Sequence, residues 1–437
     1  MKQQELRDQI LGLVAQYSKL SNKQNSFHPG ITAVPPSGKV IGDRELRFLA
    51  ESVLDGWFTA GRFNNQFEIK LASYLGLKKV ITTNSGSSAN LLALTALTSP
   101  KLGNKRLSPG DEVITVAAGF PTTVNPIIQN GSVPVFVDVG LPHYNVDVDL
   151  IETALSEKTR AIILAHTLGN PFDAAKVREI ADEHNLWLIE DCCDALGSTF
   201  QGKKVASFGD IATFSFYPAH HITMGEGGAV ATDSPRLKKI IESFRDWGRD
   251  CYCEPGADNT CNNRYEWKLG SLPEGYDHKY TYSHVGYNLK ITDMQAALGL
   301  AQLDRLESFI EQRKENFSYL SKLLYSFSDY FVLPEATPGS SPSWFGFPLS
   351  LREGVHFSRL ELLRYLESKK VGTRLLFAGN ITRQPYMKNV NYRISGSLDV
   401  TDYVMNNTFW LGIYPGLTSE MLDYVAGCIG NFMKESV

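Results

Sequence analysis

The sequence predicts an α/β protein with a mostly parallel central sheet covered by helices on both faces, followed by a smaller α+β domain. Apolar runs of strand length alternate with stretches of helical periodicity such as residues 177–184, a pattern typical of parallel sheets. The 437 residues exceed the roughly 250–300 at which one hydrophobic core stops growing, so we expect two packed domains. The expected strands are residues 79–83, 111–116, 133–139, 161–166, 186–191 and 211–217.

A long helical connector is expected to lead out of the large domain. Residues 291–324 keep apolar side chains at helical spacing, and Thr292 and Gln295 stand in capping-box positions. Beyond it, residues 344–351 predict a strand and a helix is expected to begin near Ser358. The expected divisions are an N-terminal segment (1–48), a large cofactor-binding domain (49–308) with a cysteine-rich insertion (about 250–283), and a small C-terminal domain (309–437).

Composition narrows the classes of partner. With 43% hydrophobic and 21% charged residues and a formal net charge of -4, the chain is too apolar for disorder and too acidic to favour nucleic acid or an anionic membrane. No apolar run approaches the ~18 residues of a membrane span, and the first twenty residues lack the apolar core of a signal peptide. We therefore expect a cytoplasmic protein that acts on a small molecule.

Two segments suggest an anion site and a cation site. In TTNSGSSANLLAL (82–94) a strand ends in a turn with Gly86 and Ser87, and the start of the following helix is suited to a phosphate. The alternative is that these small residues only shape the turn. Asp191 ends a buried strand, where open α/β sheets keep their ligands, and could pair with a protonated ring nitrogen. Alternatively, it caps the next helix or forms a local salt bridge.

These segments belong to a wider pattern that resembles the sugar aminotransferase and dehydratase family of fold-type I pyridoxal-phosphate enzymes. The resemblance implies a homodimer with the cofactor site at the subunit interface, because Asn288 matches a residue that reaches the partner's phosphate. It also implies that Gly86, Ser87 and Ser215 hold the phosphate, Phe120 stacks on the pyridine ring and Asp191 pairs with its nitrogen. Asp194 and Tyr217, near these residues in sequence, are candidates for positioning the cofactor. The motifs that carry the resemblance are GWFTAG (56–61), TTNSGSSAN (82–90), GFPTTVNPI (119–127), AHTLGNP (165–171), SFYP (215–218), GEGG (225–228), GYNLKITDMQAALGLAQL (286–303) and IYPG (413–416).

The chain departs from the aminotransferases of this family at the catalytic position. Where they carry lysine, this sequence has His220, placed by its fixed distance from SFYP and GEGG; the neighbouring His221 is the alternative. Imidazole can move a proton near neutral pH, but it cannot form the covalent imine that lysine forms with the cofactor. We therefore expect free pyridoxamine phosphate, with His220 as the base that removes a proton at the cofactor's 4′ carbon, and loss of a sugar hydroxyl in place of transamination.

Cysteine spacing suggests a metal centre. Cys251, Cys253 and Cys261 lie close together in the insertion, and 57 residues separate Cys193 from Cys251. Four thiolates suit an iron–sulfur cluster, although this spacing differs from the ferredoxin patterns; zinc or unligated thiols remain alternatives. Cys192 and Cys428 are expected to be ordinary buried thiols.

The cysteines together with His220 are similar to one branch of the family, the iron–sulfur 3-dehydrases of CDP-4-keto-6-deoxy-D-glucose. The resemblance implies a [2Fe–2S] cluster near the cofactor and an NADH-dependent flavin or iron–sulfur reductase as partner. If the strand through Asp191 continues, Cys193 would lie on the same face as Asp191. Two rivals stay open: a cluster-free dehydratase of the GDP-4-keto-6-deoxymannose type, and a non-enzymatic redox sensor on a transaminase-like fold. The nucleotide is not identified by the residues themselves, because Arg374 and Arg383 could bind phosphate or be ordinary surface arginines.

Overall fold

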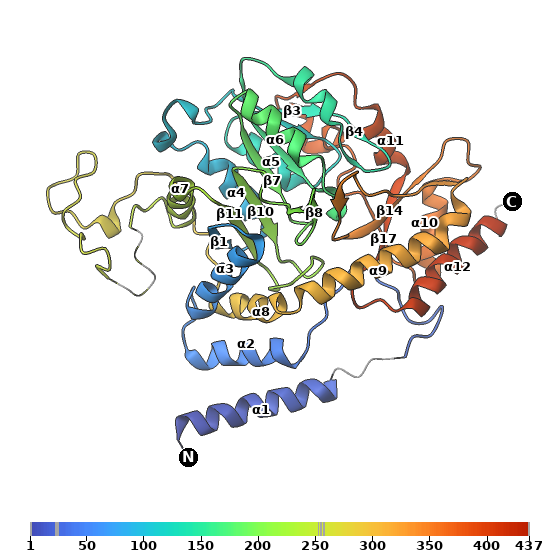
Figure 1. Ribbon diagram of the computed structural model, residues 1–437, viewed down its shortest axis with the longest axis horizontal. Helices are drawn as coiled ribbons and strands as arrows, with labels where there is room; N and C mark the ends of the chain where they lie inside the picture. Colours follow the sequence, from blue (N-terminus) through green and yellow to red (C-terminus); the bar gives the residue numbers. More distant parts are fainter. Residues whose placement is uncertain (1, 22–25, 252, 254–255, 257, 436–437) are drawn as a thin grey trace.

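The computed structural model describes residues 2–21, 26–251, 253, 256 and 258–435. Its centre is an eight-stranded sheet, parallel from β10 to β16, in which β11 runs antiparallel to both of its neighbours (Figure 1). All six strands expected from the sequence are confirmed to within two residues at each end. In spatial order the strands are β1 (Lys79–Thr83), β11 (Gly228–Thr232), β10 (Ile211–Ser215), β7 (Trp187–Asp191), β6 (Thr159–Ala165), β2 (Glu112–Val116), β3 (Val133–Val137) and β16 (Arg393–Ile394).

Helices cover both faces of this sheet because its strands are apolar on both sides. Successive residues of a strand point to opposite faces, and in β7 Leu188 and Ile189 enter different hydrophobic clusters. One face packs against α4 (Gly86–Ala96), α5 (Pro121–Gln129) and α7 (Pro235–Arg245). The other packs against α3 (Arg62–Leu75), α6 (Ala174–Glu183) and α8 (Asp293–Leu303).

The long connector is two helices where the sequence suggested one. Thr292 caps α8 in a capping box with Gln295, as expected, but α8 ends at Leu303 and α9 runs from Leu306 to Leu324. At the break, Asp304 forms ion pairs with Arg44 and Lys70, and Arg305 Nη1 lies 3.2 Å from Glu45 Oε1. These ion pairs reach the neighbouring helices α2 (Asp43–Asp55) and α3 and hold both residues at the turn.

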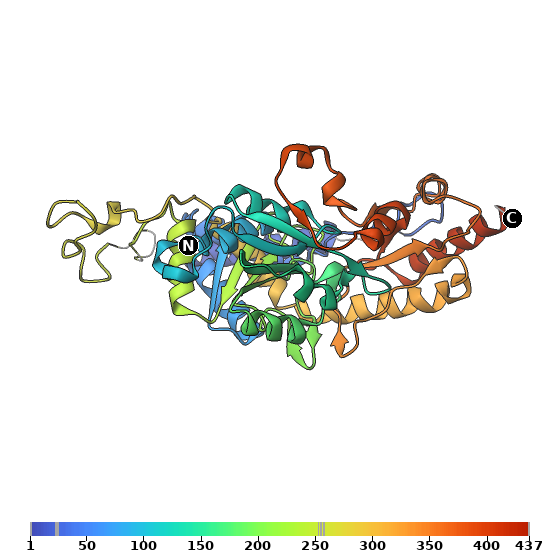
Figure 2. The ribbon, with the colours of Figure 1, turned by 90° about the horizontal axis from the view of Figure 1, so that it is seen from above.

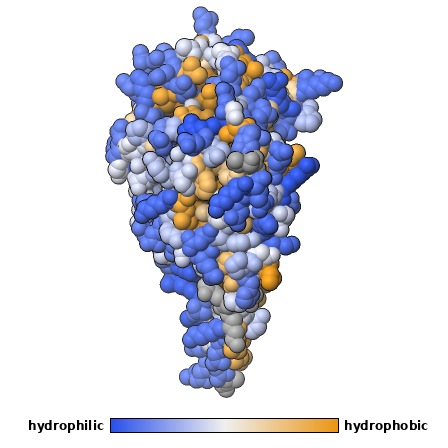
Figure 3. Space-filling model, turned by 90° about the vertical axis from the view of Figure 1, so that its right-hand side faces the viewer, coloured by the Kyte–Doolittle hydropathy of each residue, from blue (hydrophilic) through white to orange (hydrophobic). Residues whose placement is uncertain are grey.

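A second, antiparallel sheet forms the other end of the molecule. Its strands in order are β12 (Phe331–Val332), β14 (Gly346–Leu351), β17 (Thr408–Gly412) and β15 (Thr373–Leu375). It shares a core with α9, α10 (Arg359–Ser368) and α12 (Ser419–Glu435). Ser358 caps α10 as expected, and the surface at this end is mostly hydrophilic with scattered apolar side chains (Figure 3).

One strand from the C-terminal part returns to the large sheet. β16 pairs with β3, and Arg393 Nη2 lies 2.6 Å from Glu112 Oε2 on β2. Within the described residues no helix is both long and apolar enough to cross a membrane. The remaining helices and short strands are α1 (Gln3–Ser21), α11 (Asp399–Asn407), β4 (Val139–Gly140), β5 (Asn145–Val146), β8 (Thr199–Phe200), β9 (Lys203–Lys204) and β13 (Ser340–Ser341).

Candidate active site

A cavity of about 950 Å³ lies beyond the carboxyl ends of β7 and β10 and beside the N-terminus of α4. This is the edge where parallel sheets hold their ligands. Most of the expected site residues line it together: Gly86, Ser87, Phe120, Asp191, Cys193, Asp194, Ser215, Tyr217 and His220. Among the described residues, its lining includes no lysine and a single arginine, Arg374.

Asp191 is buried at the end of β7 and accepts three hydrogen bonds. The Nδ2 of Asn90 and the Oγ1 of Thr123 donate to its Oδ2 at 2.8 and 2.7 Å, and the backbone N–H of Cys193 donates to Oδ1 at 3.1 Å. These neutral donors hold the carboxylate in place without neutralising it. Asp191 therefore suits the protonated ring nitrogen of a pyridine cofactor.

The start of α4 suits the cofactor's phosphate. Ser85 caps the helix by accepting a hydrogen bond from the Ser88 N–H at 3.1 Å, and the dipole of the helix favours an anion there. The backbone of Gly86 lies against the end of β10, because a Cβ on Gly86 would be 2.4 Å from the Cβ of Ser215. This close approach brings Ser215 to the helix start, where its hydroxyl and that of Ser87 line the cavity and are suited to a phosphate.

Replacing Gly86 by alanine is expected to cost about 1–3 kcal/mol of stability, because the new methyl group overlaps Ser215. It should also weaken pyridoxamine phosphate binding, since α4 and β10 must separate. Thermal unfolding and a fluorescence titration with the cofactor measure the two effects. The matched control is Gly140→Ala, whose Cβ would meet no heavy atom within 4 Å; an equal loss in both variants would contradict the close approach.

His220 lies in the turn after β10 and faces Asp194. Its Nδ1 is 3.4 Å from Asp194 Oδ1, and its ring is 5.2 Å from the ring of Phe345. Burial raises the pKa of Asp194, although the nearby His220 opposes the shift. The Asp194 carboxylate and the Phe345 ring orient the imidazole of His220. Both His220 and Asp194 line the cavity.

His221 points away from this cavity. Its Nε2 lies 2.7 Å from the carbonyl oxygen of Ser343, its side chain is buried, and burial followed by the nearby Arg313 lowers its pKa well below the usual range. Arg313 is itself buried in α9, and its guanidinium donates to the carbonyls of Ala219 and His220 and to those of Trp344 and Phe345. These contacts fix the turn that carries His220.

Three of the four cysteines expected to bind a metal lie outside the cofactor cavity, in the insertion. Cys251 and Cys253 come together with His278, with ligand atoms within 4.8 Å of one another, and the Sγ of Cys261 is 3.6 Å from His278 Nε2. Desolvation opposes ionisation of Cys253, but hydrogen bonds from Thr260, Cys261 and Cys251 outweigh it and lower its pKa to about 6. This thiol is suited to metal binding.

Cys193 does not join these three cysteines. It lines the cofactor cavity, where burial and the neighbouring Asp191 raise its pKa well above the usual range. The strand β7 ends at Asp191, so the two residues share the cavity through the turn that follows the strand. Asn288 also lies outside the cavity lining; it is exposed and forms a β-bridge with Asp246. Cys192 and Cys428 are buried free thiols, as expected.

Sequence reasoning missed Asn90, Thr123, Phe345, Arg313 and His278. Asn90 and Thr123 stand inside the motifs at 82–90 and 119–127, so the sequence could have marked them as site candidates. That both donate hydrogen bonds to Asp191 could not be predicted, because it depends on how α4 and α5 pack on the sheet. Arg313 comes from α9 and Phe345 from the position before β14, and the fold brings both to the turn that carries His220. His278 belongs to the insertion and lies beside its cysteines, outside the cavity lining.

Comparison with known proteins agrees with this geometry. The chain is 65% identical over 432 residues to the lipopolysaccharide biosynthesis protein RfbH of Salmonella typhimurium, covering 99% of both chains. It is 54% identical to a dTDP-4-dehydro-2,6-dideoxy-D-glucose 3-dehydratase of Saccharopolyspora spinosa, covering 99% of this chain and 93% of that one.

Solved structures show the same fold. The E. coli GDP-4-keto-6-deoxy-D-mannose-3-dehydratase with bound hydrated PLP matches with a TM-score of 0.82 and 27% identity, covering 91% of this chain and 99% of the other. The fold is therefore that of fold-type I pyridoxal-phosphate enzymes. Residues 39–430 match the model of one family. With its cofactor cavity and its relatives, the chain belongs to the DegT/DnrJ/EryC1/StrS aminotransferase family.

Proposed function

We propose that this protein is a pyridoxamine-phosphate-dependent 3-dehydrase that removes the C3 hydroxyl of CDP-4-keto-6-deoxy-D-glucose. The observation that carries the proposal is the cavity lining, which among the described residues holds His220 paired with Asp194 and no lysine. Among the described residues of the lining there is thus no lysine amine for a covalent link to the cofactor. The relative of Saccharopolyspora spinosa and the solved E. coli structure, both named 3-dehydratases, support loss of a hydroxyl over transfer of an amino group.

Each residue of the cavity has a part in this reaction. Bound pyridoxamine phosphate supplies an amine for the sugar ketone and carries the electrons of the reaction. Asp191 holds the ring nitrogen in its charged form, and Gly86, Ser87 and Ser215 bind the phosphate. Phe120 and Tyr217, both exposed at the cavity, border the ring, and His220 removes the proton from the cofactor's 4′ carbon. Arg374 is the cationic group in the lining for the diphosphate of the nucleotide sugar.

The reaction consumes two electrons and two protons as the C3 hydroxyl leaves as water. We propose that Cys193, Cys251, Cys253 and Cys261 would hold a [2Fe–2S] cluster, which would supply these electrons singly, with an NADH-dependent reductase as their source. The gathering of three of these thiols and the lowered pKa of Cys253 support a metal centre in the insertion. We propose a homodimer as the active form.

The cluster is tested by electron paramagnetic resonance of anaerobically purified, dithionite-reduced protein, with iron and acid-labile sulfide measured on the same sample. We expect the signal of a reduced [2Fe–2S] centre, lost in Cys251→Ser. Iron-free protein that still dehydrates a nucleotide-linked 4-keto sugar would instead identify a cluster-free dehydratase. Protein that holds a cluster and shows no turnover with substrate and reductant would point to a redox sensor.

A further inference from the structure

The cysteines of the proposed cluster occupy two separate places in one chain. Cys193 opens into the cofactor cavity at the N-terminus of α4. The insertion is anchored at the opposite end of that helix, where the Nζ of Lys101 lies 2.5 Å from Asp250 Oδ1, next to Cys251. The eleven residues of α4 span about 16 Å, and the cavity with Cys193 shares no lining residue with the hollow that contains Cys251 and Cys253.

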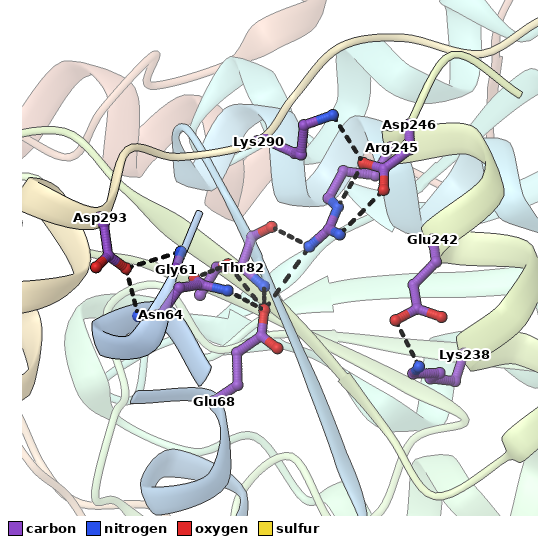
Figure 4. A network of polar contacts seen from close by, with 10 residues as sticks. All are labelled: Gly61, Asn64, Glu68, Thr82, Lys238, Glu242, Arg245, Asp246, Lys290 and Asp293. Atoms are coloured by element: carbon purple, nitrogen blue, oxygen red, sulfur yellow. Dashed lines mark hydrogen bonds and ion pairs between the residues drawn. The ribbon is translucent and has the colours of Figure 1, made fainter. Parts of the chain in front are cut away.

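The base of the insertion is held to the body of the molecule by backbone and ion-pair contacts. The segments of chain that enter and leave the insertion pair at the β-bridges Asp246–Asn288 and Arg249–Tyr282. Asp246 binds Arg245 on one side at 2.9 Å and Lys290 on the other at 3.5 Å, and Arg245 lies 3.7 Å from Glu68 on α3 (Figure 4). The insertion therefore leaves the body beyond α7 in a set direction, and both views show it projecting away from the sheet (Figures 1 and 2).

The projecting insertion carries apolar side chains that this chain leaves uncovered. Tyr265, Tyr280 and Tyr282 are each more than half exposed, and Val285, just after the insertion, is 93% exposed. Across the molecule, Phe120 and Tyr217 at the cofactor cavity are also about half exposed. Exposed aromatic side chains of this kind are common where two protein surfaces meet.

From this arrangement we infer that the cluster is completed across two copies of this chain. Cys251, Cys253 and Cys261 of one copy meet Cys193 in the cofactor cavity of the other. In a two-fold dimer the same contact occurs twice, so each pair of chains holds two clusters, each next to a cofactor. This inference rests on the proposed function, because it concerns the cluster proposed there, and it places the electron carrier directly at the cavity of the neighbouring copy.

The test is a mixed dimer of two variants carrying different affinity tags, one Cys193→Ser and the other Cys251→Ser, co-expressed and purified over both tags. Each variant alone should form iron-poor dimers. In the mixed dimer, one of the two cluster sites carries both substitutions and the other site keeps all four cysteines. We expect about half of the wild-type iron, sulfide and paramagnetic signal per dimer, whereas ligands drawn from a single chain predict none.

Other outcomes are equally decisive. A Cys193→Ser homodimer with full iron would overturn the inference and place the centre within the insertion, with His278 beside the three cysteines. Iron-free wild-type protein would instead reject the cluster of the proposed function itself. Cys428→Ser, buried in the core of the small sheet, is the matched control and should retain full iron. Circular dichroism and size-exclusion chromatography confirm that each variant is folded and dimeric.

Discussion

Replacing His220 by asparagine is expected to slow dehydration by about 10²–10⁴-fold, the usual contribution of a positioned general base. Asparagine keeps a polar side chain facing Asp194 but cannot take a proton. Binding of pyridoxamine phosphate should change little, because the groups that hold it are Asp191, Gly86, Ser87 and Ser215. Single-turnover product formation measures the rate, and a cofactor titration measures the binding.

The control for this prediction is His221→Asn. The buried His221 is bound to the carbonyl of Ser343 and faces away from the cofactor cavity, so its loss should lower the melting temperature without a comparable loss of rate. If His221→Asn abolished dehydration in folded protein while His220→Asn retained it, the assignment of the base would be wrong.

Replacing Asp191 by asparagine is expected to weaken cofactor binding by about 10²–10⁴-fold. Removing one partner of a buried charge pair costs about 3–5 kcal/mol, and asparagine would leave the ring nitrogen without its counter-charge. The amide also cannot accept from all of Asn90, Thr123 and the Cys193 N–H, so one of these donors loses its partner. Equilibrium titration with pyridoxamine phosphate measures the affinity.

Asp138 provides the matched control for this substitution. It is a buried carboxylate that accepts hydrogen bonds from Val400 and Thr401 and lies outside the cavity lining. Asp138→Asn should lower stability but leave cofactor affinity unchanged in the folded protein. Equal losses of affinity in both variants would show that Asp191 acts through the fold alone.

Most of the sheet could be predicted from the sequence because its strands are short apolar runs bounded by turns. Part of the site could be predicted for the same reason. Asp191 and Ser215 are the last residues of β7 and β10, and Gly86 begins α4 after the short turn that follows β1. The break between α8 and α9 could not be predicted, because it depends on ion pairs of Asp304 and Arg305 with residues more than two hundred positions away.

The spacing of the cysteines along the sequence could not predict where they lie in the fold. The 57 residues between Cys193 and Cys251 say nothing about the path of the chain between them. That path is set by α7 packing on α4 and by the polar contacts of Asp246, which direct the insertion away from the cavity. Likewise, His278 beside Cys261 has no signal in sequence, since 16 residues of irregular chain separate the two.

The most direct measurement of the central claim is the mass of the nucleotide sugar formed from CDP-4-keto-6-deoxy-D-glucose by the anaerobic enzyme. It is made with pyridoxamine phosphate and a reductant, and separately with pyridoxal phosphate and glutamate. We predict a product that lacks one oxygen atom relative to the substrate and appears only in the first mixture. A glutamate-dependent product in which nitrogen replaces the ketone oxygen would show an aminotransferase and contradict the account.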